Sequence, residues 1–187
     1  ACVELGVQRG GFGSTFLSAL KLLSPLTELP QYFLVDPWRH AGEREQYLDS
    51  ANVADAEQRE NVKAAVDGLA DYWQSAHFLQ LRSLEAVRLF DDESLAFVYV
   101  DARHDYCAVY QDIAAYWPKI EPGGLLAGDD WIDERHNVSW EACENGTTVK
   151  AGVNRAVRRF ASDRKVAFRH YGAWGCDQWM IFKPRRR

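Results

Sequence analysis

The sequence predicts an α/β protein with a mostly parallel, seven-stranded sheet, helices on both faces and an antiparallel hairpin at the C-terminus. Two observations carry this prediction. Short apolar runs alternate with helical patterns along the 187 residues, and such alternation produces parallel sheets with right-handed crossovers. The last two apolar runs, 166–171 and 178–183, have no helix between them, which is typical of an antiparallel hairpin. We expect one domain over residues 1–187 that lacks an N-terminal cap segment.

The seven expected strands are short runs of aliphatic and aromatic residues, which strands favour. They cover residues 3–7, 32–35, 78–81, 95–100, 124–128, 166–171 and 178–183. The expected helices have apolar residues at helical spacing. They cover residues 12–23, one or two helices within 43–75, and residues 84–90, 106–117 and 149–162. Residues 129–148 are polar and show no regular pattern.

Charge and apolar pattern exclude two classes of partner. The net charge is −5, whereas a general nucleic-acid binder needs a basic surface. The arginines at 185–187 fit a solvated tail. No apolar run approaches the roughly 18 residues of a membrane helix, so we expect no membrane span. A homo-oligomer stays open.

The cysteines and two N-x-S/T triplets bear on the compartment. The four cysteines form no C-x-x-C pair, so we expect no zinc site. The triplets at Asn137 and Asn145 are common by chance, and we assign the chain to the cytoplasm. A secretory lumen is the alternative, in which both triplets would be glycosylated and Cys143 could pair with Cys176.

A glycine-rich turn joins the first strand to the first helix. The segment VELGVQRGGFGS, residues 3–14, lets the backbone turn tightly and approach a ligand. Ligands of open α/β sheets bind outside the carboxyl ends of the strands. The spacing is not G-x-G-x-x-G, and Glu4 would repel a pyrophosphate but suits a cationic ligand. The alternative is a generic βα turn.

Carboxylates follow three of the expected strands. Asp36 ends the second strand, where a carboxylate can accept both ribose hydroxyls of an adenosine; a turn aspartate is the alternative. Asp101 ends the fourth strand, and Asp129 and Asp130 end the fifth. These three would converge at one edge of the sheet and need a counter-charge, for which Mg²⁺ or another divalent cation is suited. The alternative is that Asp129 and Asp130 only cap the next segment.

His104 lies three residues after Asp101, within reach of the same edge. A neutral imidazole there could take a proton from a substrate hydroxyl, and the metal would lower the pKa of that hydroxyl. A loop histidine bonded to the backbone is the alternative. His136, in the irregular segment, is a second candidate.

Together these residues resemble the class I S-adenosylmethionine (SAM)-dependent O-methyltransferases, which have a Rossmann-like fold. Residues 97–131, with FVYVDARHDYCAVYQDI and WPKIEPGGLLAGDDW, are most similar to the group of macrocin O-methyltransferase and cephalosporin-hydroxylase-like proteins. The resemblance spans nearly the whole chain.

The resemblance implies a role for each part of the site. The methionine end of SAM would be lined by Glu4, Gly6, Gly10 and Ser14. Asp36 would hold the ribose, Ser83 would lie on the adenine side, and Asp101 would also face the cofactor. The metal ligands would be Asp101, Asp129 and Asp130. His104 or a metal-ligand carboxylate such as Asp101 would remove the acceptor proton, since the similar catechol O-methyltransferases carry a lysine at the position of His104.

Three departures from the family pattern stand out. Ile132 occupies the position of a histidine, Gly13 replaces a polar residue, and the N-terminal segments of these families precede the point at which this chain begins.

The expected reaction is in-line methyl transfer to a hydroxyl of a small molecule or sugar that carries vicinal oxygens. Much of the rate gain would come from positioning two bound reactants. Trp131, Trp140 and Trp174 could stack on the acceptor, or could equally pack in the core. The main alternative is a non-catalytic SAM-fold binding or scaffold module, and an NAD-binding oxidoreductase is a second.

Overall fold

The computed structural model describes residues 1–23, 28–42, 47, 49–132, 140–143, 147–172 and 177–186, with the backbone alone for 140–142. The strands of the main sheet are β1 (Cys2–Leu5), β2 (Tyr32–Val35), β3 (Ala76–Leu79), β4 (Leu95–Val100), β5 (Ile120–Gly128), β8 (Phe168–Tyr171) and β9 (Gln178–Phe182). The α-helices are α1 (Gly11–Leu23), α2 (Asp55–Gly68), α3 (Ser83–Ala86), α4 (Tyr106–Tyr116) and α5 (Gly152–Arg164). Short 3-10 helices follow α2, α3 and α4, at Ala70–Tyr72, Val87–Leu89 and Trp117–Lys119.

The seven strands form one sheet in the order β3-β2-β1-β4-β5-β9-β8. The first five are parallel, whereas β9 pairs antiparallel with both β5 and β8. This arrangement confirms the fold class that the sequence predicts. The strand order reverses between β1 and β4, and ligands of such sheets bind at this switch point, beyond the carboxyl ends of the strands.

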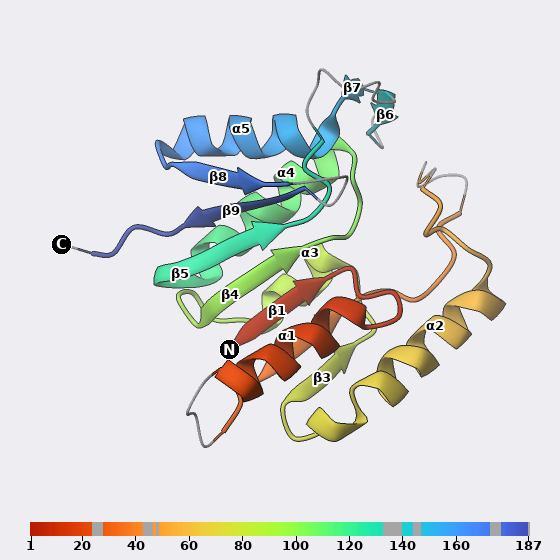
Figure 1. Ribbon diagram of the computed structural model, residues 1–187. Coiled ribbons are helices and arrows are strands. Elements are labelled where there is room, and N and C mark those ends of the chain that lie inside the picture. The colour runs from red at the N-terminus through yellow and green to blue at the C-terminus, as the bar shows by residue number, and fades with distance from the viewer. Residues whose placement is uncertain are drawn as a thin grey trace.

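Both faces of the sheet are buried, because successive strand residues point to opposite sides. Val3 and Leu5 of β1 belong to a core cluster with residues of α3, α4 and α5. Cys2 and its neighbours Tyr32 and Leu34 pack in a second cluster with residues of α1 and α2. Figure 1 shows α4 and α5 on one side of the sheet and α1 on the other. Strands buried on both faces need continuous apolar runs, which makes the polar exception Glu4 noteworthy.

Several segments differ from the sequence prediction, among them the helix expected over 149–162, which begins at Gly152. The only α-helix that the described part of 43–75 forms is α2, so residues 49–54 are a loop. The third strand begins at Ala76 rather than at residue 78. Within 129–148, which lacks a periodic pattern, strand β6 (Trp140–Ala142) pairs antiparallel with β7 (Thr148–Lys150) to form a separate two-stranded sheet. A three-residue strand is too short to show a sequence period.

The cysteine pairing also differs from the alternative that the sequence left open. Cys143 forms a disulfide with Cys107, with a Cα–Cα distance of 5.5 Å, and not with Cys176. Cys176 lies outside the described residues, as do Asn137 and Asn145. The fold brings the first turn of α4 next to the end of β6, 36 residues later in the chain. Among the described residues, no helix is both long and apolar enough to span a membrane.

Candidate active site

A cavity of about 920 Å³ lies along the carboxyl ends of β1, β2 and β4. Its volume is near the upper end of the roughly 300–1,000 Å³ that small-molecule sites occupy. The predicted site residues that line it are Glu4, Gly6, Asp36, Ser83, Asp101 and His104. The structure therefore brings most of the predicted residues into one cavity.

The glycine-rich turn forms one wall of this cavity. Gly6 has a φ of +82°, and a Cβ atom there would lie 1.9 Å from the backbone oxygen of Asp101. Only glycine fits a position with this conformation and this close an approach. Gly10 also has a positive φ, of +78°, but it packs against Ala65 of α2 and Leu69, the residue after α2, and does not line the cavity.

Glu4 is a buried carboxyl group at the base of the turn. Its side chain is 2% exposed, and Oε2 accepts a hydrogen bond from the Tyr32 hydroxyl at 2.9 Å. A Cβ atom at position 13 would lie 2.8 Å from that same oxygen. The departure at Gly13 thus has a physical reason, because a side chain there would collide with Glu4. Burial raises the pKa of Glu4 to about 8, although the hydrogen bond from Tyr32 opposes this shift.

Asp36 holds the glycine-rich turn through its carboxylate. Oδ2 accepts hydrogen bonds from the backbone N–H groups of Val7 and Gln8, at 2.9 and 3.0 Å, and Oδ1 accepts one from Trp38 at 2.7 Å. Each oxygen has more than one lone pair, so the carboxylate can hold the turn and still accept a ligand hydroxyl.

Ser83 and Ser14 have protein partners. The Ser83 hydroxyl donates to Asp112, a buried residue of α4 that also lines the cavity and that the sequence analysis did not single out. Burial raises the pKa of Asp112 to about 7, against the effect of this hydrogen bond. Ser14 donates to the carbonyl of Gly68 at 3.4 Å and lies outside the cavity lining.

His104 lies among three carboxylates. Nε2 is 2.9 Å from Oδ2 of Asp130 and 3.6 Å from Oδ1 of Asp101, and Nδ1 is 2.8 Å from Oδ2 of Asp49. The fold therefore brings Asp101 and Asp130 together with His104 and adds Asp49. Burial alone would lower the pKa of His104, but the carboxylates of Asp101, Asp130 and Asp49 outweigh it and raise the pKa well above its ordinary value.

Asp49 was missed because it lies within 43–75, where the polar pattern suggested helix. In the structure it is in the loop before α2, and its hydrogen bond with His104 lowers the pKa of its carboxyl group. A carboxylate in a polar loop has no sequence signal that distinguishes it from a solvated one.

Asp129 does not join this cluster. Its Oδ1 accepts the backbone N–H of Asp130 at 3.0 Å, which resembles the capping role kept as an alternative in the sequence analysis. Asp130 itself has a φ of +57°, a left-handed conformation that its neighbour's carboxylate helps to hold.

A divalent cation fits the group of Asp101, His104 and Asp130. Each residue offers one ligand atom, and these atoms lie within 4.8 Å of one another. Nε2 of His104 is buried, and its contacts with the two carboxylates lack hydrogen-bond geometry. One imidazole nitrogen with two carboxylates is a mixed ligand set. Such a set favours Mn²⁺ or Zn²⁺ over the Mg²⁺ expected from oxygen ligands alone.

A smaller cavity of about 70 Å³ adjoins His104 and Asp130. It is lined by Ile132 and by the first residues of α5. Ile132, at the position where the family pattern has a histidine, therefore contributes an apolar wall beside the cluster.

Trp131 is a core residue. It is 1% exposed and stacks on the ring of His170, with the guanidinium of Arg158 over its own ring, so it cannot stack on an acceptor. The Trp140 side chain, Trp174 and His136 lie outside the described residues.

Comparison with known proteins establishes the family. A family model described as a methyltransferase domain matches residues 3–131, more than half of the chain. The chain belongs to this family. It is a SAM-dependent methyltransferase, as the resemblance in its motifs implied. The NAD-binding alternative is wrong for the same reason. No curated protein matches the sequence.

Solved structures show the same fold at low identity. A putative O-methyltransferase from Klebsiella pneumoniae is 15% identical, with 99% of this chain and 73% of that chain covered and a TM-score of 0.64. An O-methyltransferase from Bacillus cereus in complex with SAH is 16% identical, with 97% and 73% covered and a TM-score of 0.58. Spermidine synthase from Thermotoga maritima is 13% identical, with 99% and 54% covered and a TM-score of 0.57. Since a synthase shares the fold, the fold alone does not determine the acceptor.

Proposed function

We propose that this methyltransferase transfers the methyl group of SAM to a hydroxyl of a small molecule or sugar with vicinal oxygens, assisted by a divalent cation. The observation that carries the proposal is the position of His104, between Asp49 on one side and Asp101 and Asp130 on the other. Asp49, Asp101 and His104 line the cavity that Glu4 and Asp36 also line, and Asp130 lines the smaller cavity next to His104.

The cavity divides into a cofactor end and an acceptor end. Glu4, Gly6 and Asp36 line the cofactor end, where the Glu4 carboxyl group faces the cationic methionine part of SAM and Asp36 accepts the ribose hydroxyls. Asp101 and His104 line the acceptor end, and Asp130 lies beside it, with Oδ2 2.9 Å from Nε2 of His104. SAM supplies the methyl group through its sulfonium, and the O-methyltransferase from Bacillus cereus that shares this fold was solved in complex with SAH.

His104 serves as the general base. Asp49 holds Nδ1, which leaves Nε2 to take the proton of the acceptor hydroxyl. The acceptor oxygen then bonds to the methyl carbon as the carbon–sulfur bond breaks, with SAH as the leaving group. A divalent cation held by Asp101 and Asp130 would lower the pKa of the acceptor hydroxyl. With their charge neutralised, these carboxylates would no longer hold His104 protonated.

The test is a methyl-transfer assay with SAM and a panel of acceptors that includes 3,4-dihydroxybenzoate and sugars with vicinal hydroxyls. Reactions contain Mg²⁺, Mn²⁺ or EDTA, and products are identified by mass spectrometry. A methylated oxygen that forms only with metal supports the proposal. His104→Gln should abolish turnover while SAM affinity, measured by calorimetry, stays the same. The matched control is His77→Gln in β3, outside the cavity lining.

Two results would count against the proposal. SAM binding without methyl transfer to any acceptor would favour the non-catalytic module. Full turnover in EDTA would remove the cation from the mechanism and leave His104 as the sole activating group.

A further inference from the structure

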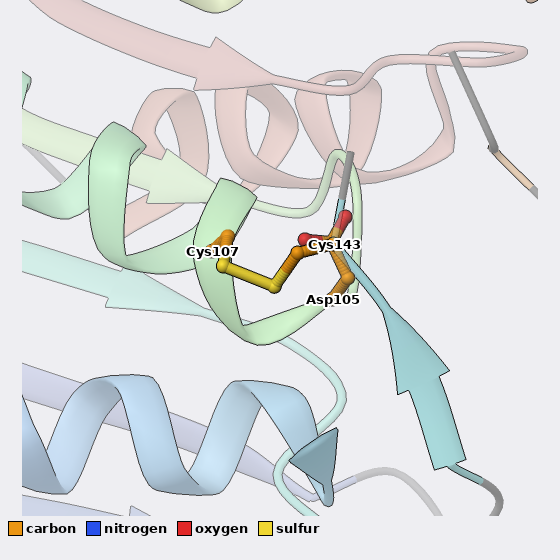
Figure 2. A group of neighbouring side chains, drawn as sticks. All are labelled: Asp105, Cys107 and Cys143. Atoms are coloured by element: carbon orange, nitrogen blue, oxygen red, sulfur yellow. A yellow bond between two sulfur atoms is a disulfide. The ribbon is translucent and has the colours of Figure 1, made fainter. Parts of the chain in front are cut away.

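The disulfide between Cys107 and Cys143 lies in the wall of the cavity. Both cysteines line it, and Cys143 is fully buried. Cys107 is the second residue of α4, three positions after His104. Figure 2 shows the disulfide running from the first turn of α4 to the end of β6, next to Asp105. The covalent bond is therefore adjacent to the acceptor end of the cavity.

The strands that this bond holds, β6 and β7, are separate from the main sheet. They pair only with each other among the described strands. The N–H of Cys143 donates to the carbonyl of Thr147 at 2.8 Å, which continues the ladder toward the turn. In Figure 1 the pair lies beyond the carboxyl ends of β4 and β5, away from the sheet.

The two ends of this pair line the two cavities that His104 also lines. Cys143 follows β6 and lines the large cavity, whereas Ala151 follows β7 and lines the small cavity beside His104 and Asp130. A shift of the pair would consequently change the walls around the acceptor. The cofactor end, around Glu4 and Asp36, is built from β1 and β2 and contains no residue of the pair.

The other end of the bond is rigid. Asp105 caps α4 by accepting the N–H of Ala108 at 3.0 Å, and its Oδ2 accepts from Arg103 at 2.8 Å. Val109 and Ile113 of the same helix are in the core. The disulfide thus fastens two short strands to a fixed point of the domain. Asp105, Cys107 and Cys143 would also suit a zinc ion as two thiolates and a carboxylate, but the sulfurs are bonded to each other, which favours the crosslink.

We infer that the Cys107–Cys143 disulfide is a redox-sensitive tether that holds β6 and β7 against the acceptor end, so that acceptor binding depends on the oxidation state of this pair. The inference rests on the proposed function for the identity of the acceptor end. A dithiol would reduce this bond in two steps. One of its thiolates attacks a cysteine sulfur, which breaks the protein S–S bond and forms a mixed disulfide, and its second thiol then closes a cyclic disulfide on the reductant. Two protein thiols result. Because disulfides persist in oxidising compartments and are reduced in the cytosol, acceptor binding would then differ between the two.

The first experiment is hydrogen–deuterium exchange on the oxidised chain and on the chain reduced with dithiothreitol. Faster exchange in peptides that cover 140–150 after reduction, with peptides of β1 and β4 unchanged, supports the tether. Equal exchange in both states overturns it, as does mass spectrometry showing both cysteines as thiols in the untreated protein. This experiment does not depend on methyl transfer, so it still decides the tether if no acceptor is found.

The second experiment measures ligand binding by calorimetry in the double variant Cys107→Ser/Cys143→Ser. The affinity for SAH should stay within about twofold of the wild type, and that for 3,4-dihydroxybenzoate with SAH and Mn²⁺ present should fall about tenfold, because loosened walls must be ordered on binding. Dithiothreitol should have no further effect on this variant. The control is Cys2→Ala, which removes a free buried thiol and leaves the disulfide intact. If the double variant lost affinity for SAH and for 3,4-dihydroxybenzoate equally, a role confined to the acceptor end would be overturned. If the wild type did not bind 3,4-dihydroxybenzoate, this result would count against the proposed acceptor class.

Discussion

Nδ1 of His104 lies 2.8 Å from Oδ2 of Asp49, a residue 55 positions earlier in the chain. This contact fixes which ring nitrogen faces the acceptor end, because it leaves Nε2 directed toward Asp101 and Asp130. An imidazole held in this way has a defined orientation and tautomer.

Asp49→Asn should therefore lower kcat by about 10- to 100-fold, as loss of an orienting carboxylate typically does, with SAM affinity unchanged. Loss of the carboxylate also lowers the pKa of His104, so the acid limb of the pH–rate profile should move to lower pH. Steady-state kinetics across pH test both effects. Asp71→Asn, an exposed position outside the cavity, is the control. An unchanged profile for Asp49→Asn would show that this carboxylate does not act through His104.

Asp129 and Asp130 are adjacent, and only Asp130 has an oxygen within the ligand group. Asp130→Asn should raise the Mn²⁺ concentration needed for half-maximal turnover by about tenfold or more, whereas Asp129→Asn should change it little. Titration of turnover with Mn²⁺ in the two variants makes the comparison. A larger effect of Asp129→Asn would restore the ligand set predicted from the resemblance.

Gly6 has no room for a side chain. Gly6→Ala should destabilise the fold by about 2–4 kcal/mol, because a positive φ and a backbone clash both oppose the new methyl group. The matched control is Gly11→Ala in the same turn, where nothing lies within 4 Å of an added Cβ. Thermal unfolding of the two variants should separate them by several degrees, and equal stability would contradict the close approach of Asp101.

The raised pKa of Glu4 predicts a pH dependence of stability. With a pKa of about 8 in the folded chain against an ordinary value of 4.5, the unfolded chain ionises first as pH rises. Protonated Glu4 therefore contributes a stabilisation of the folded chain that is fully present below pH 4.5 and is lost as pH rises to about 8. Glu4→Gln should reduce this slope, measured by denaturant unfolding at several pH values. Glu121→Gln, at an exposed position of β5, should retain it.

Binding of SAM should release a proton from Glu4. At pH 7 the carboxyl group is mostly neutral, and a cationic ligand beside it would favour the ionised form. The apparent binding enthalpy should therefore vary with the ionisation enthalpy of the buffer, and affinity should rise with pH between 6 and 8. Calorimetry in phosphate and in Tris tests this, and a buffer-independent enthalpy would place the methionine end of SAM away from Glu4.

Much of the architecture could be predicted because its determinants are local. The apolar runs at 32–35 and 95–100 coincide with β2 and β4, since strands buried on both faces need uninterrupted apolar residues. The positions of Asp36 and Asp101 followed from the same reasoning, because the carboxyl ends of parallel strands share one edge. Pro118 ended the prediction for α4 at residue 117, one residue after the observed end.

The sequence by itself determined the fold class and the edge of the sheet where the cavity lies, because these depend on periodicity and on residues next to strands, and the resemblance of its motifs implied the cofactor family. The tertiary structure alone decided that Asp49 orients His104, that Asp130 rather than Asp129 faces it, and that Cys107 pairs with Cys143. Each of these contacts joins side chains through the packing of loops, and loop conformation follows from long-range contacts that leave no period in the sequence.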